Sequence, residues 1–500
     1  MKAGARLERL EAIVDASGVA ERIEALLPVG VRPRQLRVRT LLLGMLAAAA
    51  DGRPAHLSRV HAALLWLPGP EQRRLGVIAE WKDGPHRLTY RQVERTFSLV
   101  AGALASEEPD GRPSEALAAV LDALLEASVE VCGEPRTSSY AVDWTDTESF
   151  SRPPKKDGSC ADPEAAWGHR RGDSPGEADE SFFGYYLQVV TSVEEERGPA
   201  VPELVRRILL ASCKADPPAA LVPVIERMAA AGIALGDLLA DSGYAYRVPE
   251  TWALPMRRLG IELVQELHPA DRGPKGTHMG AIRANGNLYC PATPTALLEL
   301  GPLHRGASEA ETAAHDRKAT ELSAHKLGPI AGYDPDGYRR VGCPATRGKL
   351  RCPLRAESMG LDHTRPGVIS PPEHPPTCCA QQTITVPPQV NAKTAQKHDY
   401  PSPSHRRSYA RRSAAERAYA TVKDPASNDI SRGWCRLTGL TPIALFAASV
   451  IVARNLRVAD AFAARQAEEE RRAAKGMAPK RRRRRRQTTA DLIGAANAPP

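Results

Sequence analysis

Aromatic residues are scarce, at 5% of the 500-residue chain, and no apolar run is as long as a membrane-spanning helix. Such a helix needs roughly 20 consecutive, mostly apolar residues. The most apolar run, residues 443–453, is much shorter and predicts a buried core helix. The N-terminal residues carry charge but lack the apolar segment of a secretory signal. We therefore expect a cytoplasmic protein with no membrane role.

Cysteine is also infrequent, with nine residues in the chain, and so few in a long cytosolic chain argue against a disulfide framework. Five of the nine lie between residues 265 and 400, namely Cys290, Cys343, Cys352, Cys378 and Cys379. Two interpretations remain open, a Zn²⁺ site and partly buried free thiols. The Cys-x2-Cys spacing typical of zinc ribbons is missing, and adjacent Cys378 and Cys379 cannot easily bind one ion together.

Positive charge is in excess, because 68 Lys and Arg residues outnumber 59 Asp and Glu residues and give a formal net charge of +9. A basic chain gains affinity for nucleic acid by neutralising phosphates and releasing their counterions. An acidic protein partner or plain solubility would explain the same charge. The basic run at residues 480–486 either holds DNA nonspecifically or is a solubilising end.

The length predicts two or three domains, and the first, residues 1–132, is predicted to be all-α. Apolar residues recur at spacings of three and four in four segments, residues 36–50, 56–65, 90–105 and 115–129. Thr89 and Gln92 form a capping box at the start of the third segment. This domain either binds DNA through residues such as Arg91 and Arg95 or simply presents a charged, solvated face.

Residues 133–264 have a mixed pattern that predicts the first part of an α/β domain. Strands are expected at residues 138–143, 182–193 and 235–240. Helices are expected at residues 201–215 and 219–231, and the polar segment 151–180 is expected to be a surface loop.

The rest of the chain is divided by composition. Between residues 265 and 400 regular periodicity fades and prolines accumulate, which indicates an irregular, Cys-containing insertion. Residues 401–464 regain helical patterns, with a last apolar helix over 441–457, and predict the second part of the α/β domain. Residues 465–500 are dominated by Glu, Arg, Ala and Lys and predict a disordered basic tail.

The most informative segment begins at Tyr409 and continues through Arg412 and Glu416 to Lys423. On a single α-helix these four polar residues would share an arc of roughly 60°. An ion pair between Arg412 and Glu416, four residues apart, would explain part of this pattern on structural grounds alone. It does not explain why Tyr409 and Lys423 lie on the same face, where a packing helix would present apolar residues.

The segment resembles DDE transposases of bacterial insertion sequences, in the group marked by Tyr-x2-Arg-x3-Glu-x6-Lys, and it matches every anchor of that motif. Ala141-Val-Asp143-Trp-Thr145 resembles the strand that supplies the first acid of these enzymes. Leu239-Ala-Asp241-Ser-Gly-Tyr244 resembles the segment around the second acid. The resemblance covers about residues 135 to 457.

The resemblance implies an RNase H-like catalytic domain with Asp143, Asp241 and Glu416 as the catalytic acids. It places the first acid on the central strand, the second just after a neighbouring strand and the third on a later helix. Carboxylate oxygens suit Mg²⁺ or Mn²⁺, and two such ions would activate the attacking oxygen and stabilise the leaving oxygen of a phosphoryl transfer. Tyr409, Arg412 and Lys423 are then expected at the DNA phosphates.

The expected activity is cleavage of insertion-element ends in the bacterial nucleoid and joining of the freed end to target DNA. The expected partners are double-stranded DNA and a second copy of the chain. Two alternatives remain, a nuclease of the same fold without strand transfer and an inactive DNA-binding relic. Asp146 and Glu148 are the competitors of Asp143, and Asp237 is the competitor of Asp241.

Overall fold

The computed structural model describes most of the chain. The described residues are 3–28, 34–81, 84–106, 111–133, 137–156, 158–170, 180–304, 306–424, 427–431 and 433–478. The basic run at residues 480–486 lies outside them, so its predicted role stays a prediction.

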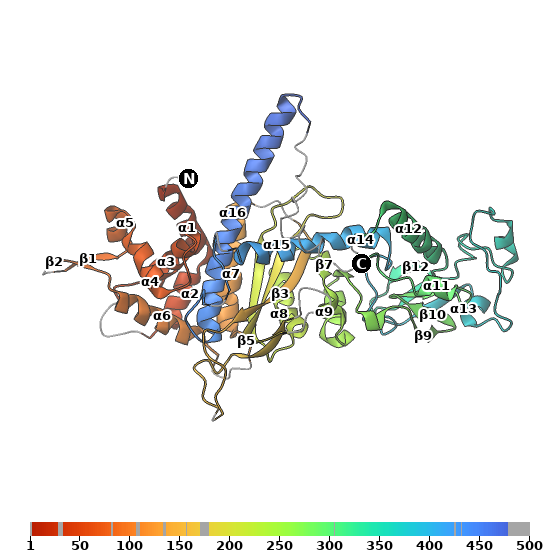
Figure 1. Ribbon diagram of the computed structural model, residues 1–500, viewed down its shortest axis with the longest axis horizontal. Coiled ribbons are helices and arrows are strands. Elements are labelled where there is room, and N and C mark those ends of the chain that lie inside the picture. Colours follow the sequence, from red (N-terminus) through yellow and green to blue (C-terminus); the bar gives the residue numbers. More distant parts are fainter. Residues whose placement is uncertain are drawn as a thin grey trace, which may run out of the picture.

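The N-terminal part is a bundle of helices on one side of the molecule (Figure 1). Its elements are α1 (Ala3–Ser17), α2 (Val19–Leu26), α3 (Val38–Ala50), α4 (Leu57–Leu65), α5 (Gly69–Arg74), β1 (Ile78–Trp81), β2 (Gly84–Arg87), α6 (Tyr90–Leu104) and α7 (Glu115–Cys132). The four predicted helices are confirmed, and so is the capping box, in which the Thr89 hydroxyl accepts from the Gln92 N–H. The antiparallel hairpin β1–β2 corrects the all-α prediction. Its strands are only four residues long and mostly exposed, so no apolar alternation marks them.

The centre of the molecule is a six-stranded mixed sheet, and this confirms the α/β class. Its strands are β3 (Tyr140–Glu148), β4 (Ala166–Arg170), β5 (Glu180–Ser192), β6 (Val205–Ser212), β7 (Asp237–Ala240) and β8 (Glu262–Gln265). The order is β4-β5-β3-β7-β8, and β6 also pairs with β5. β3 runs antiparallel to β5 and parallel to β7, and β7 runs parallel to β8. β3 is therefore the central strand, with β7 beside it.

Three predictions about this sheet are wrong. The helix expected over 201–215 is strand β6, whose apolar run Ile208 to Leu210 is paired along β5 and buried from both faces of the sheet. Asp143 does not end its strand, because β3 continues to Glu148 through polar residues that pair with β5 as far as Gly184. β4 also lies within the segment expected to be only a surface loop.

Helices cover both faces of the sheet. One face packs against α7, α15 (Ser413–Val422) and α16 (Leu440–Ala474), in a core that continues into the N-terminal helices. The other face packs against α8 (Pro217–Ala230), α9 (Ser242–Ala245) and α10 (Ala253–Arg258). A short 3-10 helix, η1 (Pro249–Thr251), precedes α10.

α16 is longer than predicted and continues to Ala474, ten residues into the range expected to be disordered. The helix is long and apolar enough by composition to cross a membrane, yet 83% of its most apolar window is buried inside the protein. Its buried residues end at Ala459, and the remainder projects from the body as a charged helix (Figure 1). Helical hydrogen bonds continue there because Ala, Glu and Arg are strong helix formers.

The insertion is only partly irregular, which corrects the prediction for residues 265–400. It contains η2 (Pro269–Asp271), β9 (Pro274–His278), β10 (Ala281–Ala284), β11 (Asn287–Tyr289), α11 (Thr295–Leu298), α12 (Glu309–Ala324), β12 (Gly328–Tyr333), β13 (Arg339–Gly342), η3 (Ala356–Gly360), α13 (Thr377–Ala380) and β14 (Thr383–Val386). The strands form two small antiparallel sheets, β11-β10-β9 and β12-β13-β14. Strands of three to six residues rich in Gly and Pro give no readable period, which explains why pattern analysis missed them.

Asn455 ties α16 to the sheet at a fully buried position. Its amide Nδ2 donates to the Val205 carbonyl and its Oδ1 accepts from the Val205 N–H, at 2.8 and 2.9 Å. Asn455→Leu would leave both backbone groups without these partners, so we expect the free energy of unfolding to fall by about 2 to 4 kcal/mol. Urea unfolding followed by circular dichroism measures this. Ser449→Ala on the same helix removes only a bond to Leu445 within α16, and we expect a loss under about 1 kcal/mol. Equal losses in both variants would contradict the prediction.

Candidate functional site

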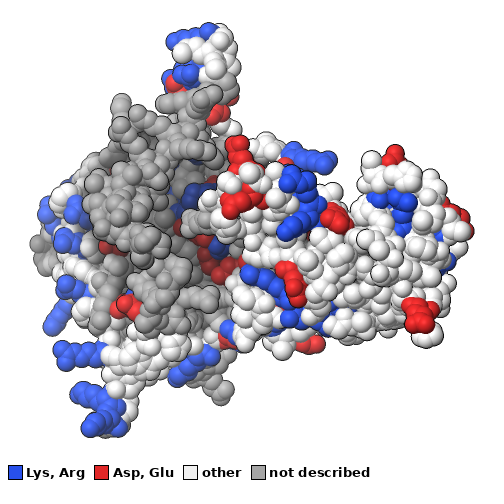
Figure 2. All heavy atoms as spheres, turned by 45° about the vertical axis from the view of Figure 1, so that its right-hand side comes forward, with Lys and Arg blue, Asp and Glu red and all other residues white. Residues whose placement is uncertain are grey.

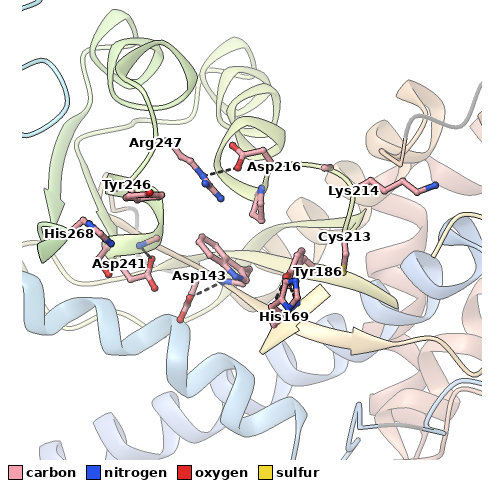
Figure 3. A pocket seen from close by; sticks show the side chains of 15 residues that line it. Asp143, His169, Tyr186, Cys213, Lys214, Asp216, Asp241, Tyr246, Arg247 and His268 are labelled. Carbon is pink, nitrogen blue, oxygen red and sulfur yellow. Dashed lines mark hydrogen bonds and ion pairs between the residues drawn. The ribbon is translucent and has the colours of Figure 1, made fainter. Parts of the chain in front are cut away.

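Three carboxylates that are far apart in the sequence come together beside the central strand. Asp143 lies on β3, Asp241 follows the last residue of β7, and Glu416 lies in the first turn of α15. Because β3 and β7 are adjacent and parallel, with Ala141 opposite Leu239, Asp143 lies beside Asp241 where β7 ends. Asp143 interacts electrostatically with both other acids. Figure 3 shows Asp143 and Asp241 next to each other at the edge of a cavity.

Local hydrogen bonds hold these acids in place. Asp241 is the N-cap of α9, where its Oδ1 accepts from the Gly243 N–H at 2.8 Å. The buried Tyr419 hydroxyl lies 2.7 Å from the Asp143 carbonyl oxygen and 2.8 Å from that of Leu187. Tyr419 therefore fixes α15, which carries Glu416, against β3 and β5.

Burial raises the pKa of the Asp143 carboxyl from its ordinary 3.8 to about 7. The neighbouring charges of Asp241 and Glu416 act in the same direction, and Arg412 opposes them. The Asp143 side chain is 16% exposed, whereas Glu416 is 55% exposed at the outer side of the group. Clustered carboxylates in such a place favour either protons or cations as neighbours.

Arg412 is the cation that the protein itself supplies. Its Nη1 lies 3.1 Å from Asp143 Oδ2, and its Nη2 pairs with Glu416. The intrahelical pair considered from the sequence is thus present. Arg412 also joins that pair to Asp143 on the sheet, which a purely local ion pair would not do.

The segment from Tyr409 to Lys423 is not one continuous helix. α14 (Pro403–Tyr409) and α15 are separated by the 3-10 helix η4 (Ala410–Arg412). The single continuous helix is therefore corrected, but a 3-10 turn has three residues per turn and keeps Arg412 on the same side of the segment as Tyr409.

Tyr409 and Lys423 are both engaged within the protein. The Tyr409 ring stacks on the His405 ring, with their centroids 5.7 Å apart. The Arg412 guanidinium lies over the Tyr409 ring, 5.6 Å from its centroid. Lys423 Nζ lies 2.6 Å from Thr145 Oγ1 and 3.2 Å from Asp146 Oδ1. Tyr409 therefore supports Arg412, and Lys423 braces the polar half of β3.

The competing acids have other partners. Asp146 and Glu148 pair with Arg170 of β4, at 2.6 and 3.0 Å. Asp237 begins β7 and pairs with Arg411 and Lys397, each at 2.7 Å. Asp146, Glu148 and Asp237 thus form structural ion pairs, whereas Asp143 and Asp241 line the cavity.

The cavity beside Asp143 and Asp241 has a volume of about 640 Å³ and contains residues that sequence reasoning missed. The Tyr246 and His268 rings lie with centroids 4.3 Å apart, and Arg247 pairs with Asp216 at 2.7 Å (Figure 3). Its other lining residues are Trp144, His169, Tyr186, Cys213, Lys214, Ala215, Pro217, Ser242 and Gly243. The only sequence signal was the position of Tyr246 and Arg247 soon after Asp241. The cavity offers exposed rings and cations next to the acids.

On the face drawn in Figure 2, the charges of the described residues do not mark out a surface for a polyanion. Lys and Arg over the insertion are interspersed with Asp and Glu on the face in Figure 2. The carboxylates and the cavity are therefore the more specific features.

The donor chemistry of Asp143, Asp241 and Glu416 fits Mg²⁺ or Mn²⁺, which prefer carboxylate oxygens. Buried Asp143, whose pKa is raised by burial and by the other acids, gains from an added cation. Among the described residues no group of three or more His, Cys, Asp or Glu side chains is already arranged as a metal-binding shell, and the five insertion cysteines are free thiols. Closing a shell at the acids would require Arg412 to release Asp143.

The fold and the site define an α/β protein with a carboxylate cluster at the edge of a polar cavity. Comparisons with protein-family models, curated proteins and solved structures found no match.

Proposed function

We propose that the chain is a DDE-type DNA transposase with an RNase H-like catalytic domain. One observation carries the proposal: Asp143 lies near enough to Asp241 and Glu416 to interact with both electrostatically, although the sequence separates them widely. The support is positional, because the first acid lies on the central strand, the second follows a neighbouring strand and the third lies on a later helix. These are the positions that the resemblance implies.

The proposed reaction has two steps at one site. Water first attacks the phosphodiester at the element end and frees a 3′-hydroxyl. That hydroxyl then attacks a target phosphodiester, so one P–O bond forms as another breaks and no external energy source is required. Two bound divalent cations would activate the attacking oxygen and stabilise the leaving oxygen.

The residues of the chain supply position and charge. Asp143, Asp241 and Glu416 would hold the cations, and Arg412, released from Asp143, would face a phosphate. The Tyr246–His268 pair and Arg247 line the cavity and would contact the DNA strand through stacking and charge. Tyr419 keeps α15 on the sheet during both steps.

The test uses DNA from both sides of the chain's own coding region. Labelled fragments are incubated with the full-length protein and a supercoiled plasmid in Mg²⁺ or Mn²⁺. We expect cleavage at a fixed position and joining of the labelled 3′ end to the plasmid. Cleavage without joining would replace the proposal by a nuclease of the same fold. DNA binding without cleavage would replace it by an inactive relic.

A further inference from the structure

The cysteines of the insertion form a group that the proposed reaction does not use. Cys290 follows β11, Cys343 follows β13, Cys352 lies in the loop after it, and Cys379 lies on α13. Cys290, Cys343 and Cys352 pack in one buried cluster with Ala345, Leu350 and Val368. Cys379 interacts electrostatically with Cys290 and Cys352. Four separate stretches of chain therefore bring thiols to one place.

Three of these cysteines begin the same kind of turn. Each is followed by proline, in Cys290-Pro291, Cys343-Pro344 and Cys352-Pro353. The Cys carbonyl accepts a bond from the third residue on in each case. The donors are the Thr293 N–H at 3.0 Å, the Thr346 hydroxyl at 2.8 Å and the Arg355 N–H at 2.9 Å. Proline is favoured at the second position of such turns, so one tight turn begins at each of these three cysteines.

The surroundings cannot stabilise these turns by apolar packing alone. Between Cys343 and Gln382 the regular structure consists of the short η3 and α13, and the rest is loop at the end of the molecule (Figure 1). Half of the six buried members of the local cluster are the cysteines themselves. Small units without an adequate core are commonly stabilised by a disulfide or a structural metal. The cysteines are free thiols, so they are available as metal ligands.

We propose that Cys290, Cys343, Cys352 and Cys379 bind one structural Zn²⁺ as four thiolates. Four-thiolate sites from separated turns suit this ion, and binding releases the thiol protons to solvent. Cys378 also interacts electrostatically with Cys290 and Cys343, and both Cys378 and Cys379 pack against the adjacent core. Cys378 is left out because it is buried in that core with Ala281 and Ile384, whereas Cys379 is only partly buried there, and adjacent cysteines bind one ion poorly together. The four thiols are not arranged as a closed shell, so binding requires them to turn toward a shared ion.

The test measures metal in the full-length chain purified without chelators and under reducing conditions. We expect one zinc per chain in the wild type, and near zero in Cys290→Ser, Cys343→Ser, Cys352→Ser and Cys379→Ser. Cys378→Ser and Cys132→Ser, which lies on α7, are matched controls that should keep the zinc. Loss of zinc in Cys378→Ser and its retention in Cys379→Ser would overturn the assignment of Cys379.

A second measurement covers variants that fail to fold. Co²⁺ added to the reduced wild-type protein after zinc removal should give the intense thiolate-to-cobalt absorption of a tetrahedral four-thiolate site. Substoichiometric zinc together with no such absorption would overturn the proposal. Both readouts are independent of DNA cleavage, so they do not depend on the proposed function.

Discussion

Replacing Asp143 with Asn is expected to lower the rate of DNA-end cleavage by about 1000-fold or more. The variant keeps the side-chain shape but loses the charged oxygen that lies between Arg412, Asp241 and Glu416. Losing an anionic ligand would remove several kcal/mol of transition-state stabilisation, and each 1.4 kcal/mol is about a factor of ten in rate. Single-turnover cleavage of an end fragment at saturating protein measures the effect.

The same substitution should not weaken the fold above neutral pH. Because burial holds the pKa of Asp143 near 7 in the folded chain, against 3.8 ordinarily, ionisation favours the unfolded state. This penalty is absent below about pH 4, grows as the pH rises toward about 7, and is then constant at a few kcal/mol. In metal-free buffer the Asn variant should therefore gain stability over the wild type between pH 4 and pH 7.

Two comparisons separate these effects. Mg²⁺ should raise the unfolding temperature of the wild type but not of the Asn variant, because only the wild type retains the full set of acids. Asp146→Asn changes an acid on the same strand whose partners are Arg170 and Lys423, and we expect a much smaller loss of cleavage. An Asp143→Asn variant that cleaves at the wild-type rate would remove Asp143 from the reaction.

The helices and the outline of the site could be predicted from the sequence because their signals are local. Amphipathic spacing and the Thr89 cap specify α6, and the apolar residues before Asp241 specify the end of β7. β6 was mistaken for a helix because a short, doubly buried strand has no period of two. Its identity depends on pairing with β5, whose residues lie elsewhere in the chain.

The cavity could not be predicted for a related reason. His169, Lys214 and His268 reach it from different elements, and only the completed sheet brings them near Asp143. The break at η4 was equally invisible, since Ala410 and Arg411 are compatible with an α-helix. The η4 backbone is held instead by Arg411, whose contacts lie on β7 and in the loop after β5.

Replacing Asp237 with Ala is expected to destabilise the chain by about 3 kcal/mol. The Asp237 and Arg411 side chains are 7% and 8% exposed and lie 2.7 Å apart, so the substitution leaves a buried guanidinium without its main partner. Breaking a buried pair costs about 3 to 5 kcal/mol, and the lower value applies because Glu196 lies 3.4 Å from Arg411 and can partly replace the lost carboxylate. Urea unfolding of the wild type and of the Asp237→Ala variant, measured in parallel, gives the difference in stability.

Losing the Asp237–Arg411 pair should also affect the site, because Arg411 anchors η4 next to Arg412. We therefore expect Asp237→Ala to cleave DNA more slowly at temperatures where it is still folded. Glu262→Ala is the matched control. Glu262 is 59% exposed and lies 3.8 Å from Lys397, so its removal should cost less than about 1 kcal/mol and leave cleavage unchanged. The double variant Asp237→Leu, Arg411→Met should lose less stability than Asp237→Ala, because it removes both buried charges. The single variants Asp237→Leu and Arg411→Met are measured beside it. If the double variant loses as much stability as these two variants together, the pair is not coupled and η4 is held by its other contacts.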